Sequence, residues 1–378
     1  MKVSDLAECP DRRADVIALM QKEFPRGQPQ SSALPFDDEF GALLRDNPPE
    51  RILFIEDNGL VVSALGWKSF LLKQGLKIAA IGLVVTDSAH RKKGHSRNLV
   101  LEAEKRAHAE QCALACLWSD LLEFYTKLGY VLASSEISWD LSEVPNIEEL
   151  AVSENFDDPT IREITTSDVS ELMRLYANDP LGPARDESVF LRQLRQSDTL
   201  SLVAAPQGKP AAYALCGKGR DLRNVIHELV GDQKYFPALI EHARNVLARV
   251  EPLTAVRLQF PVNHHLQEEL EVILNAGEQG AVCFAKILIM DDVVVALNAE
   301  FKVQGFESLR IKYMSDLNAW TLEDSKQDIF MSPDPAHLLQ IFAHPWDLEE
   351  LEGLPGRTLK RLVGWQPYPL YFWGPDGV

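Results

Sequence analysis

The sequence is organised around residues 84–99, which read VVTDSAHRKKGHSRNL. An apolar run over residues 78–85 leads into this stretch, and its RKKGHS segment, residues 91–96, opens directly into an amphipathic helical pattern. A strand, a short polar turn and a helix N-terminus in this order form an anion site, because several backbone N–H groups and the positive end of the helix dipole point at one place. Gly94 lets the backbone approach a ligand without a Cβ in the way. The stretch therefore predicts a binding site for a phosphate or pyrophosphate group.

The composition is that of a globular protein with more than one domain. A chain of 378 residues suits two or three domains, and its 46% hydrophobic and 25% charged residues are ordinary values. No apolar run approaches the roughly 20 residues that a membrane helix needs, and the first residues lack an apolar signal core. We therefore expect a cytoplasmic protein that has no membrane partner. The five cysteines show no CxxC pair and no metal-ligand spacing, so we expect free thiols and no metal.

The formal net charge of −18 bears on the partners of the chain. Nucleic-acid surfaces need clustered Lys and Arg side chains that neutralise phosphates, which such an acidic chain does not favour. The charge is compatible with a cationic amine substrate, although it also serves solubility alone. We therefore expect no nucleic-acid partner, and the oligomeric state stays open.

Residues 1–142 predict a strand, two helices, three antiparallel strands, a helix, a strand, a short helix and two final strands. The clearest local signal is Asp-Asn-Gly at residues 57–59, because Asn-Gly between two apolar runs is typical of a β-hairpin. The two final strands are expected at residues 130–133 and 136–141.

The same order of elements returns after residues 143–159, an acidic segment with two prolines that we interpret as a linker. Residues 160–290 repeat the pattern without strong residue identity, so a duplicated domain is the economical explanation. Residues 291–378 form a different C-terminal module. Its aromatic tail, residues 365–378, is expected to pack into a groove, because so many aromatic side chains are unfavourable in solvent.

A second motif, FYTKLGY at residues 124–130, follows the predicted loop in the order that one known family shows. With residues 91–96 it resembles the GNAT superfamily of acyl-CoA-dependent N-acetyltransferases. The family's pyrophosphate loop reads Arg or Gln, two residues, Gly, one residue, then Gly or Ala, and its second signature is an aromatic-Tyr-x-x-Leu-Gly-aromatic run. The resemblance implies an α/β (α+β) fold with two tandem GNAT-like domains, whose mixed, mostly antiparallel central sheet is flanked by helices. Residues 1–142 would be the catalytic domain and residues 160–290 a degenerate second one.

The resemblance also implies acetyl-CoA as acyl donor and assigns the residues that would hold it. In this assignment the loop amides bind the pyrophosphate, Arg91 adds charge, a backbone N–H near Val85 polarises the thioester carbonyl, and Ser119 contacts the pantetheine arm. Ser96 departs from the family's Gly or Ala, but it is small, suits a helix start and is a candidate hydroxyl donor to a phosphate. The assigned cofactor residues are Val84, Val85, Thr86, Arg91, Lys92, Lys93, Gly94, His95, Ser96 and Ser119.

Tyr125 is the candidate general acid, which would give its proton to the departing thiolate. The general base stays open, because residues 78–85 contain no carboxylate. Asp120, Glu123, His90 and a chain of waters are candidates. The layout of two repeats and a C-terminal module also resembles the enhanced-intracellular-survival type of acetyltransferase, in which the terminal carboxylate reaches the first active site. This resemblance makes Val378 a second catalytic candidate.

The second repeat lacks the loop, since residues 231–236 read GDQKYF and contain no spaced glycines. We expect it to form one side of the substrate cleft, to pack against the first repeat and to bind no second coenzyme A. The leading hypothesis is an acetyl-CoA-dependent N-acetyltransferase that acts on a small cationic amine or a lysine side chain of a peptide. The competing hypothesis is a non-catalytic acyl-CoA-binding module, and aminoacyl transfer is disfavoured because the acidic chain offers no tRNA surface. The acyl group and the acceptor stay open.

Overall fold

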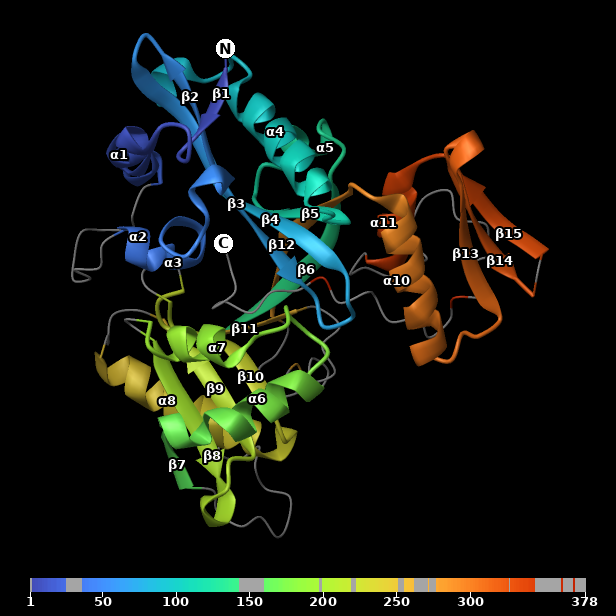
Figure 1. Cartoon of the computed structure of the whole chain (residues 1–378). Helices are drawn as coiled ribbons and strands as arrows, with labels where there is room; N and C mark the ends of the chain where they lie inside the picture. Colours follow the sequence, from blue (N-terminus) through green and yellow to red (C-terminus); the bar gives the residue numbers. More distant parts are fainter. Residues whose placement is uncertain are drawn as a thin grey trace.

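The computed structural model describes residues 2–24, 36–142, 160–196, 199–218, 222–250, 255–261, 271, 277–325, 327–343, 362 and 370. Within these residues the chain forms a mixed sheet of 12 strands and a separate antiparallel sheet of three strands. Helices cover the large sheet, and the small sheet lies to one side of it (Figure 1). The predicted α/β class with a mixed, mostly antiparallel sheet is therefore confirmed.

The first half follows the predicted order closely. The expected hairpin forms around Asn58-Gly59, and the strands on either side pair antiparallel. Asn58 and Gly59 both have a positive φ, as a tight hairpin turn requires. The predicted helix at residues 36–44 divides into two short helices. The strands and helices are β1 (Val3–Asp5), α1 (Arg13–Glu23), α2 (Phe36–Glu39), α3 (Gly41–Leu44), β2 (Ile52–Asp57), β3 (Leu60–Leu71), β4 (Lys77–Thr86), α4 (His95–Ala109), β5 (Leu114–Trp118), α5 (Leu122–Thr126) and β6 (Val131–Asp140).

The second half repeats this order, as predicted. Within the described residues it contains β7 (Thr160–Glu163), α6 (Val169–Asn178), α7 (Glu187–Leu194), β8 (Leu200–Ala205), β9 (Ala212–Cys216), β10 (Val225–Gly231), α8 (Phe236–Val250), β11 (Arg257–Pro261) and β12 (Glu278–Ile287). The repeated pattern also predicts a short helix at residues 266–274, which lie almost wholly outside the described residues.

The two halves share one sheet, because each contributes a strand to the other. The strand order is β1-β2-β3-β4-β5-β12-β6-β11-β10-β9-β8-β7, so β12 lies between β5 and β6. In turn, β6 lies between β12 and β11 and pairs antiparallel with both. The cores follow the exchange: Ile137 and Trp139 of β6 belong to the core of the second half, whereas Phe284 of β12 belongs to that of the first.

This exchange corrects the prediction of two strands at residues 130–133 and 136–141. The chain does not turn at Ser134 and Ser135; β6 runs straight through them, and both serines are buried. At these serines β6 pairs with β12, and from Glu136 onward it also pairs with β11, so both neighbours of the strand come from the other half of the chain. The β pattern was therefore recognised correctly, but its division into two strands was wrong.

The C-terminal module packs on the first half of the sheet. It begins with α10 (Met290–Val303), followed by β13 (Leu309–Met314), β14 (Ala319–Asp324), β15 (Gln327–Ser332) and α11 (Pro335–Phe342). The helix α10 and the strand β15 were not predicted from the sequence. The side chains of α10 and α11 pack on β4, β5 and β12, while α4 covers the opposite face of β4 and β5. The aromatic tail falls outside the described residues, apart from Leu370, and its expected packing into a groove stays a prediction.

Two further observations concern the whole chain. The five cysteines are free thiols, and four of them are buried. None of the helices that the structure describes is long and apolar enough to cross a membrane.

Candidate active site

The sheet opens between β4 and β5, beside the predicted loop. The two strands pair in parallel only as far as Ile81 and Leu117, whereas β4 continues to Thr86. An extra residue in β4 also breaks its register with β3, and Leu83 there has a φ of 52°. A bulge of this kind bends a strand and interrupts its ladder. The last residues of β4 are therefore free of β5, which leaves backbone groups on that side for a ligand.

The ladder decides which backbone groups of β4 face this opening. The N–H of Asp87 donates to the carbonyl of Val62 at 2.9 Å, and the register then pairs Thr86 with Ser63 and Val85 with Ala64. Hydrogen-bonded pairs alternate along an antiparallel ladder. The N–H of Val85 therefore points toward β3, and the N–H of Thr86 points toward β5. This refines the expected donor near Val85: Thr86 presents the N–H on the open side.

The loop after β4 closes on itself and delivers the start of α4. Gly94 precedes the helix with a φ of 81°, a left-handed conformation that other residues adopt only with strain. A Cβ at Gly94 would meet no atom within 4 Å, so within the chain itself the backbone conformation, and not crowding, requires glycine here. Among the described residues, the backbone N–H groups of residues 92–96 have no acceptor. First-turn amides of a long helix are those that bind phosphate groups.

The charges around this turn suit an anion. Lys92 and Lys93 are exposed, and neither forms an ion pair with the residues that the structure describes. Lys92 also has a left-handed φ of 63°, so two residues of the turn, Lys92 and Gly94, have left-handed backbone conformations. Five amides with no acceptor, two lysines and the positive end of a 15-residue helix therefore fit a pyrophosphate.

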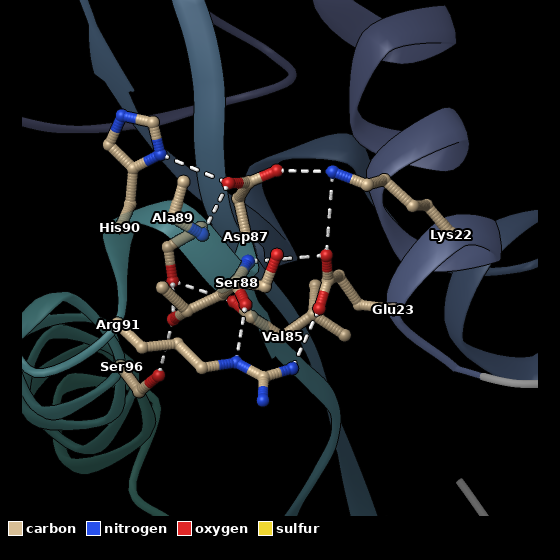
Figure 2. A network of polar contacts seen from close by, with 11 residues as sticks. Lys22, Glu23, Val85, Asp87, Ser88, Ala89, His90, Arg91 and Ser96 are labelled. Carbon is tan, nitrogen blue, oxygen red and sulfur yellow. Dashed lines mark hydrogen bonds and ion pairs between the residues drawn. The ribbon is translucent and has the colours of Figure 1, made fainter.

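Arg91 makes contacts within the protein that the sequence did not indicate. Its guanidinium Nη2 lies 2.7 Å from the carboxylate of Glu23 at the end of α1, and its Nε donates to the carbonyl of Thr86 at 3.3 Å. The Glu23 carboxylate also accepts from the N–H of Ser88 at 3.3 Å (Figure 2). The charge of Arg91 is therefore balanced within the protein, and the side chain ties α1 to the loop.

A second ion pair from α1 fixes the other end of the loop. The ammonium of Lys22 lies 2.5 Å from Asp87, whose other carboxylate oxygen accepts from the N–H of Ala89 and contacts the ring of His90 (Figure 2). The hydrogen bond from Lys22, followed by that from His90, holds the pKa of Asp87 well below its usual range. His90 thus lies beside a carboxylate within the loop.

Tyr125 lies in α5 with only 4% of its surface exposed. Its ring packs edge-on against Phe124 and Tyr130, with centroid distances of 4.9 and 5.8 Å. Burial, with a smaller contribution from Asp120, raises the pKa of Tyr125 to about 12. Its hydroxyl makes no hydrogen bond with the described residues, so it keeps its proton at neutral pH and can offer it to a ligand.

The remaining candidates occupy the surface near α5. The Ser119 hydroxyl accepts from the N–H of Leu121 at 3.1 Å, so it caps the turn into α5. Asp120 is exposed, and Glu123 is 91% exposed and lies 3.7 Å from Lys127. None of these contacts singles out a general base. Val378 lies outside the described residues, and its role stays a prediction.

His95, the first residue of α4, is 2% exposed, and neither ring nitrogen has a partner among the described residues. Burial lowers its pKa below 6.5, with nearby positive charges adding to the effect.

Protonation of His95 is thus easier in the unfolded chain than in the folded protein, and the free energy of unfolding should fall as the pH drops from about 6.5. We expect a His95→Phe variant to lose less stability between pH 7 and pH 5 than the wild type in urea unfolding. Equal losses would contradict this account of His95.

Among the residues of the second half that the structure describes, none form a comparable loop. Gly231 ends β10 with a φ of 115°, and a Cβ there would lie 2.4 Å from the carbonyl oxygen of Ala211. Asp232 then accepts from the N–H of Lys234 and lies 2.9 Å from its ammonium. A carboxylate and a tight strand contact thus occupy the positions where the first half has its amides and lysines.

The residues of α1 that form ion pairs with the loop were not predicted from the sequence. Glu23 and Lys22 lie on α1, more than 60 positions before their partners in the chain, and only the fold brings them together. Ser63 offered a signal, because it interrupts the apolar run that follows the Asn-Gly turn. Its hydroxyl contacts the end of β4, as described below.

Comparisons with known proteins agree with this geometry. Residues 11–133 match the model of the acetyltransferase (GNAT) domain family. No curated protein matches the sequence. Eis1 from Mycobacterium abscessus has a similar structure, with 14% sequence identity and a TM-score of 0.62 over 98% of this chain and 100% of that one.

Two further solved structures share the fold. A tandem GNAT protein from the clavulanic acid biosynthesis pathway is 13% identical, with a TM-score of 0.51 over 76% of this chain and 98% of its own. A probable N-acyltransferase from Enterococcus faecalis V583 is 15% identical, with a TM-score of 0.57 over 78% of this chain and 74% of its own. Residues 11–133 are therefore similar to the acetyltransferase (GNAT) domain family, and the chain shares the fold of Eis1 and of tandem GNAT proteins.

Proposed function

We propose that this chain transfers an acetyl group from acetyl-CoA to a primary amine, with one coenzyme A site per chain at the loop between β4 and α4. The observation that carries the proposal is the start of α4: five backbone N–H groups have no acceptor among the described residues, and two unpaired lysines adjoin them. Such a turn suits a pyrophosphate. The similarity of residues 11–133 to the acetyltransferase (GNAT) domain family supports coenzyme A as its source.

Each residue of the site would have a defined task. The amides of residues 92–96 hold the pyrophosphate, and Ser119 lies at the end of β5 on the other side of the opening. The N–H groups on the open side of β4, including that of Thr86, are available to the pantetheine arm and to the thioester carbonyl. Val84 and Val85 provide the backbone at this point, and coenzyme A supplies an activated acyl group as its thioester.

The proton balance of the transfer assigns Tyr125 its role. A C–N bond forms to the amine and the C–S bond breaks, so the amine loses a proton and the thiolate gains one. Tyr125 is protonated at neutral pH and lies in the segment after β5. A positioned hydroxyl that donates to the thiolate lowers the barrier to its departure. The group that accepts the proton of the amine stays a prediction, with Val378 among the candidates.

The acceptor is proposed by class. An acidic chain with a net charge of −18 favours the approach of cations. A small cationic amine and an exposed lysine side chain of a peptide both fit this condition. The alternative function is a non-catalytic acyl-CoA-binding module, which would use the same loop and would not need the hydroxyl of Tyr125.

Thiol release from acetyl-CoA, measured against a panel of aliphatic polyamines, aminoglycosides and lysine peptides, tests the proposal. We expect amine-dependent release that follows one class of the panel and gives an acetylated amine of matching mass. Binding of coenzyme A without thiol release with any amine would favour the non-catalytic module. Failure to bind coenzyme A would contradict both functions.

A further inference from the structure

Three side-chain hydroxyls form a continuous chain from the middle of β3 to the first turn of α4. The hydroxyl of Ser63, which is fully buried, donates to the carbonyl of Val85 at 2.7 Å. The oxygens of Ser63 and Thr86 lie 2.8 Å apart, and those of Thr86 and Ser96 lie 2.7 Å apart. The chain therefore joins the end of β4 to the helix that follows the loop.

The protons of these hydroxyls have only one consistent arrangement. Each hydroxyl has a single hydrogen, and that of Ser63 is used on the carbonyl of Val85. Thr86 must then donate to Ser63, and Ser96 must donate to Thr86. The hydroxyl of Ser96 consequently has only acceptor lone pairs left for a ligand, which do not suit a phosphate oxygen. Its predicted role as a side-chain donor to phosphate is thus incompatible with this chain of hydrogen bonds.

The chain connects the two parts of the proposed cofactor site. At one end, Ser96 lies in the turn whose amides face the pyrophosphate. At the other, Val85 and Thr86 form the part of β4 that diverges from β5. The contact between Thr86 and Ser96 also joins the two ends of the loop, residues 87–95, so that the turn of α4 cannot move without moving Thr86.

We propose that Ser63, Thr86 and Ser96 are positioning residues, which hold the pyrophosphate-binding turn in register with the thioester-binding end of β4. This inference rests on the proposed function. It makes the serine at the family's Gly or Ala position a specific feature of this chain, one that acts through Thr86 and not on the phosphate. A ligand that spans both parts of the site depends on this register, whereas a ligand confined to the turn does not.

Isothermal calorimetry of the full chain with two probes tests the register. Coenzyme A spans both parts, and 3′-phosphoadenosine 5′-diphosphate contains the pyrophosphate without the pantetheine arm. We expect Ser96→Ala and Thr86→Val each to weaken coenzyme A about fivefold, as the loss of one hydrogen bond suggests, while the affinity for the fragment stays within about twofold. Thr86→Ser, which keeps the hydroxyl, should restore most of the affinity lost in Thr86→Val.

Ser135→Ala is the matched control, because it removes the hydroxyl of another fully buried serine, which has no partner among the described residues. It should leave both affinities at the wild-type values, and melting temperatures identify any variant that fails to fold. Equal weakening of both probes by Ser96→Ala would show a direct phosphate contact and overturn the inference, as would unchanged coenzyme A binding. If the wild type binds neither probe, the proposed function fails together with the inference. If the wild type binds coenzyme A and Ser96→Ala binds it equally well, the inference alone fails.

Discussion

Replacement of Tyr125 by phenylalanine should lower kcat by about 10²- to 10³-fold, because a positioned acid contributes a factor of this order. The KM for acetyl-CoA should stay within about twofold, since the ring and its packing against Phe124 and Tyr130 are kept. Steady-state kinetics of thiol release measures both constants. Burial raises the pKa of Tyr125 to about 12, so its ionisation should produce no loss of kcat in the pH profile up to about pH 10.

Tyr130→Phe is the control for this variant. Tyr130 follows five residues later and packs edge-on against Tyr125, but none of its surface is exposed, so it cannot touch a substrate. We expect its kcat to stay within about twofold of the wild type. Equal losses in the two variants would show that the ring packing, and not the hydroxyl of Tyr125, supports turnover.

Replacement of Glu228 by glutamine should destabilise the second half by about 3–5 kcal/mol. Glu228 in β10 and Arg185 form a bidentate pair with two contacts of 2.8 Å, and the two side chains are 0% and 1% exposed. The hydroxyl of Tyr213 also donates to Glu228 at 2.6 Å. The variant would remove the carboxylate charge from a fully buried bidentate pair while the buried Arg185 charge remains, and removing one partner of such a pair is the costly way to break it. Urea unfolding followed by tryptophan fluorescence measures the loss.

Two comparisons make this prediction specific. Glu123→Gln breaks a pair with Lys127 in which both side chains are largely exposed, so it should cost less than about 1 kcal/mol. The double variant Arg185→Met with Glu228→Leu removes both charges and should recover much of the stability lost in Glu228→Gln. A similar small loss in Glu228→Gln and Glu123→Gln would contradict the importance of the buried pair.

The features that were predictable from sequence are those carried by local patterns. The hairpin at Asn58-Gly59, the turn at Gly94 and the start of α4 depend on residues adjacent in the chain, and the structure places them as expected. The GNAT resemblance rested on the same local motifs, and the family model confirms it at residues 11–133. Tyr125 was recognised as a candidate for the same reason, although its catalytic role is a proposal.

The strand exchange could not be predicted in this way. A strand pattern indicates that β6 and β12 are strands, but the choice of partner is made between segments about 150 positions apart. Each strand completes the sheet of the other half, and no local signal distinguishes this from a hairpin. The braces from Glu23 and Lys22 were missed for a related reason: their partners are set by how α1 packs on β3 and β4.

Other misses had a local signal that was available. The helix α10 has apolar residues at helical spacing, all of them buried: Met290, Val293, Val294, Leu297 and Phe301. It was not predicted, because an apolar strand precedes it directly and the strand prediction extended to Met290. Ser63 likewise stood out in an apolar strand. Arg91 was expected at the pyrophosphate because of its motif position, whereas a nearby carboxylate, Glu23, binds it in the structure.

The central claim, that the loop between β4 and α4 is the one coenzyme A site of the chain, is tested most directly by calorimetric titration of coenzyme A into the full chain. We predict about one equivalent per chain, abolished by Gly94→Asp and retained by Gly208→Asp. Gly94 and Gly208 have the same φ of 81° and open space around a Cβ, so both variants carry the same strain and differ only in place. Two equivalents per chain, no binding, or equal loss in both variants would contradict the account.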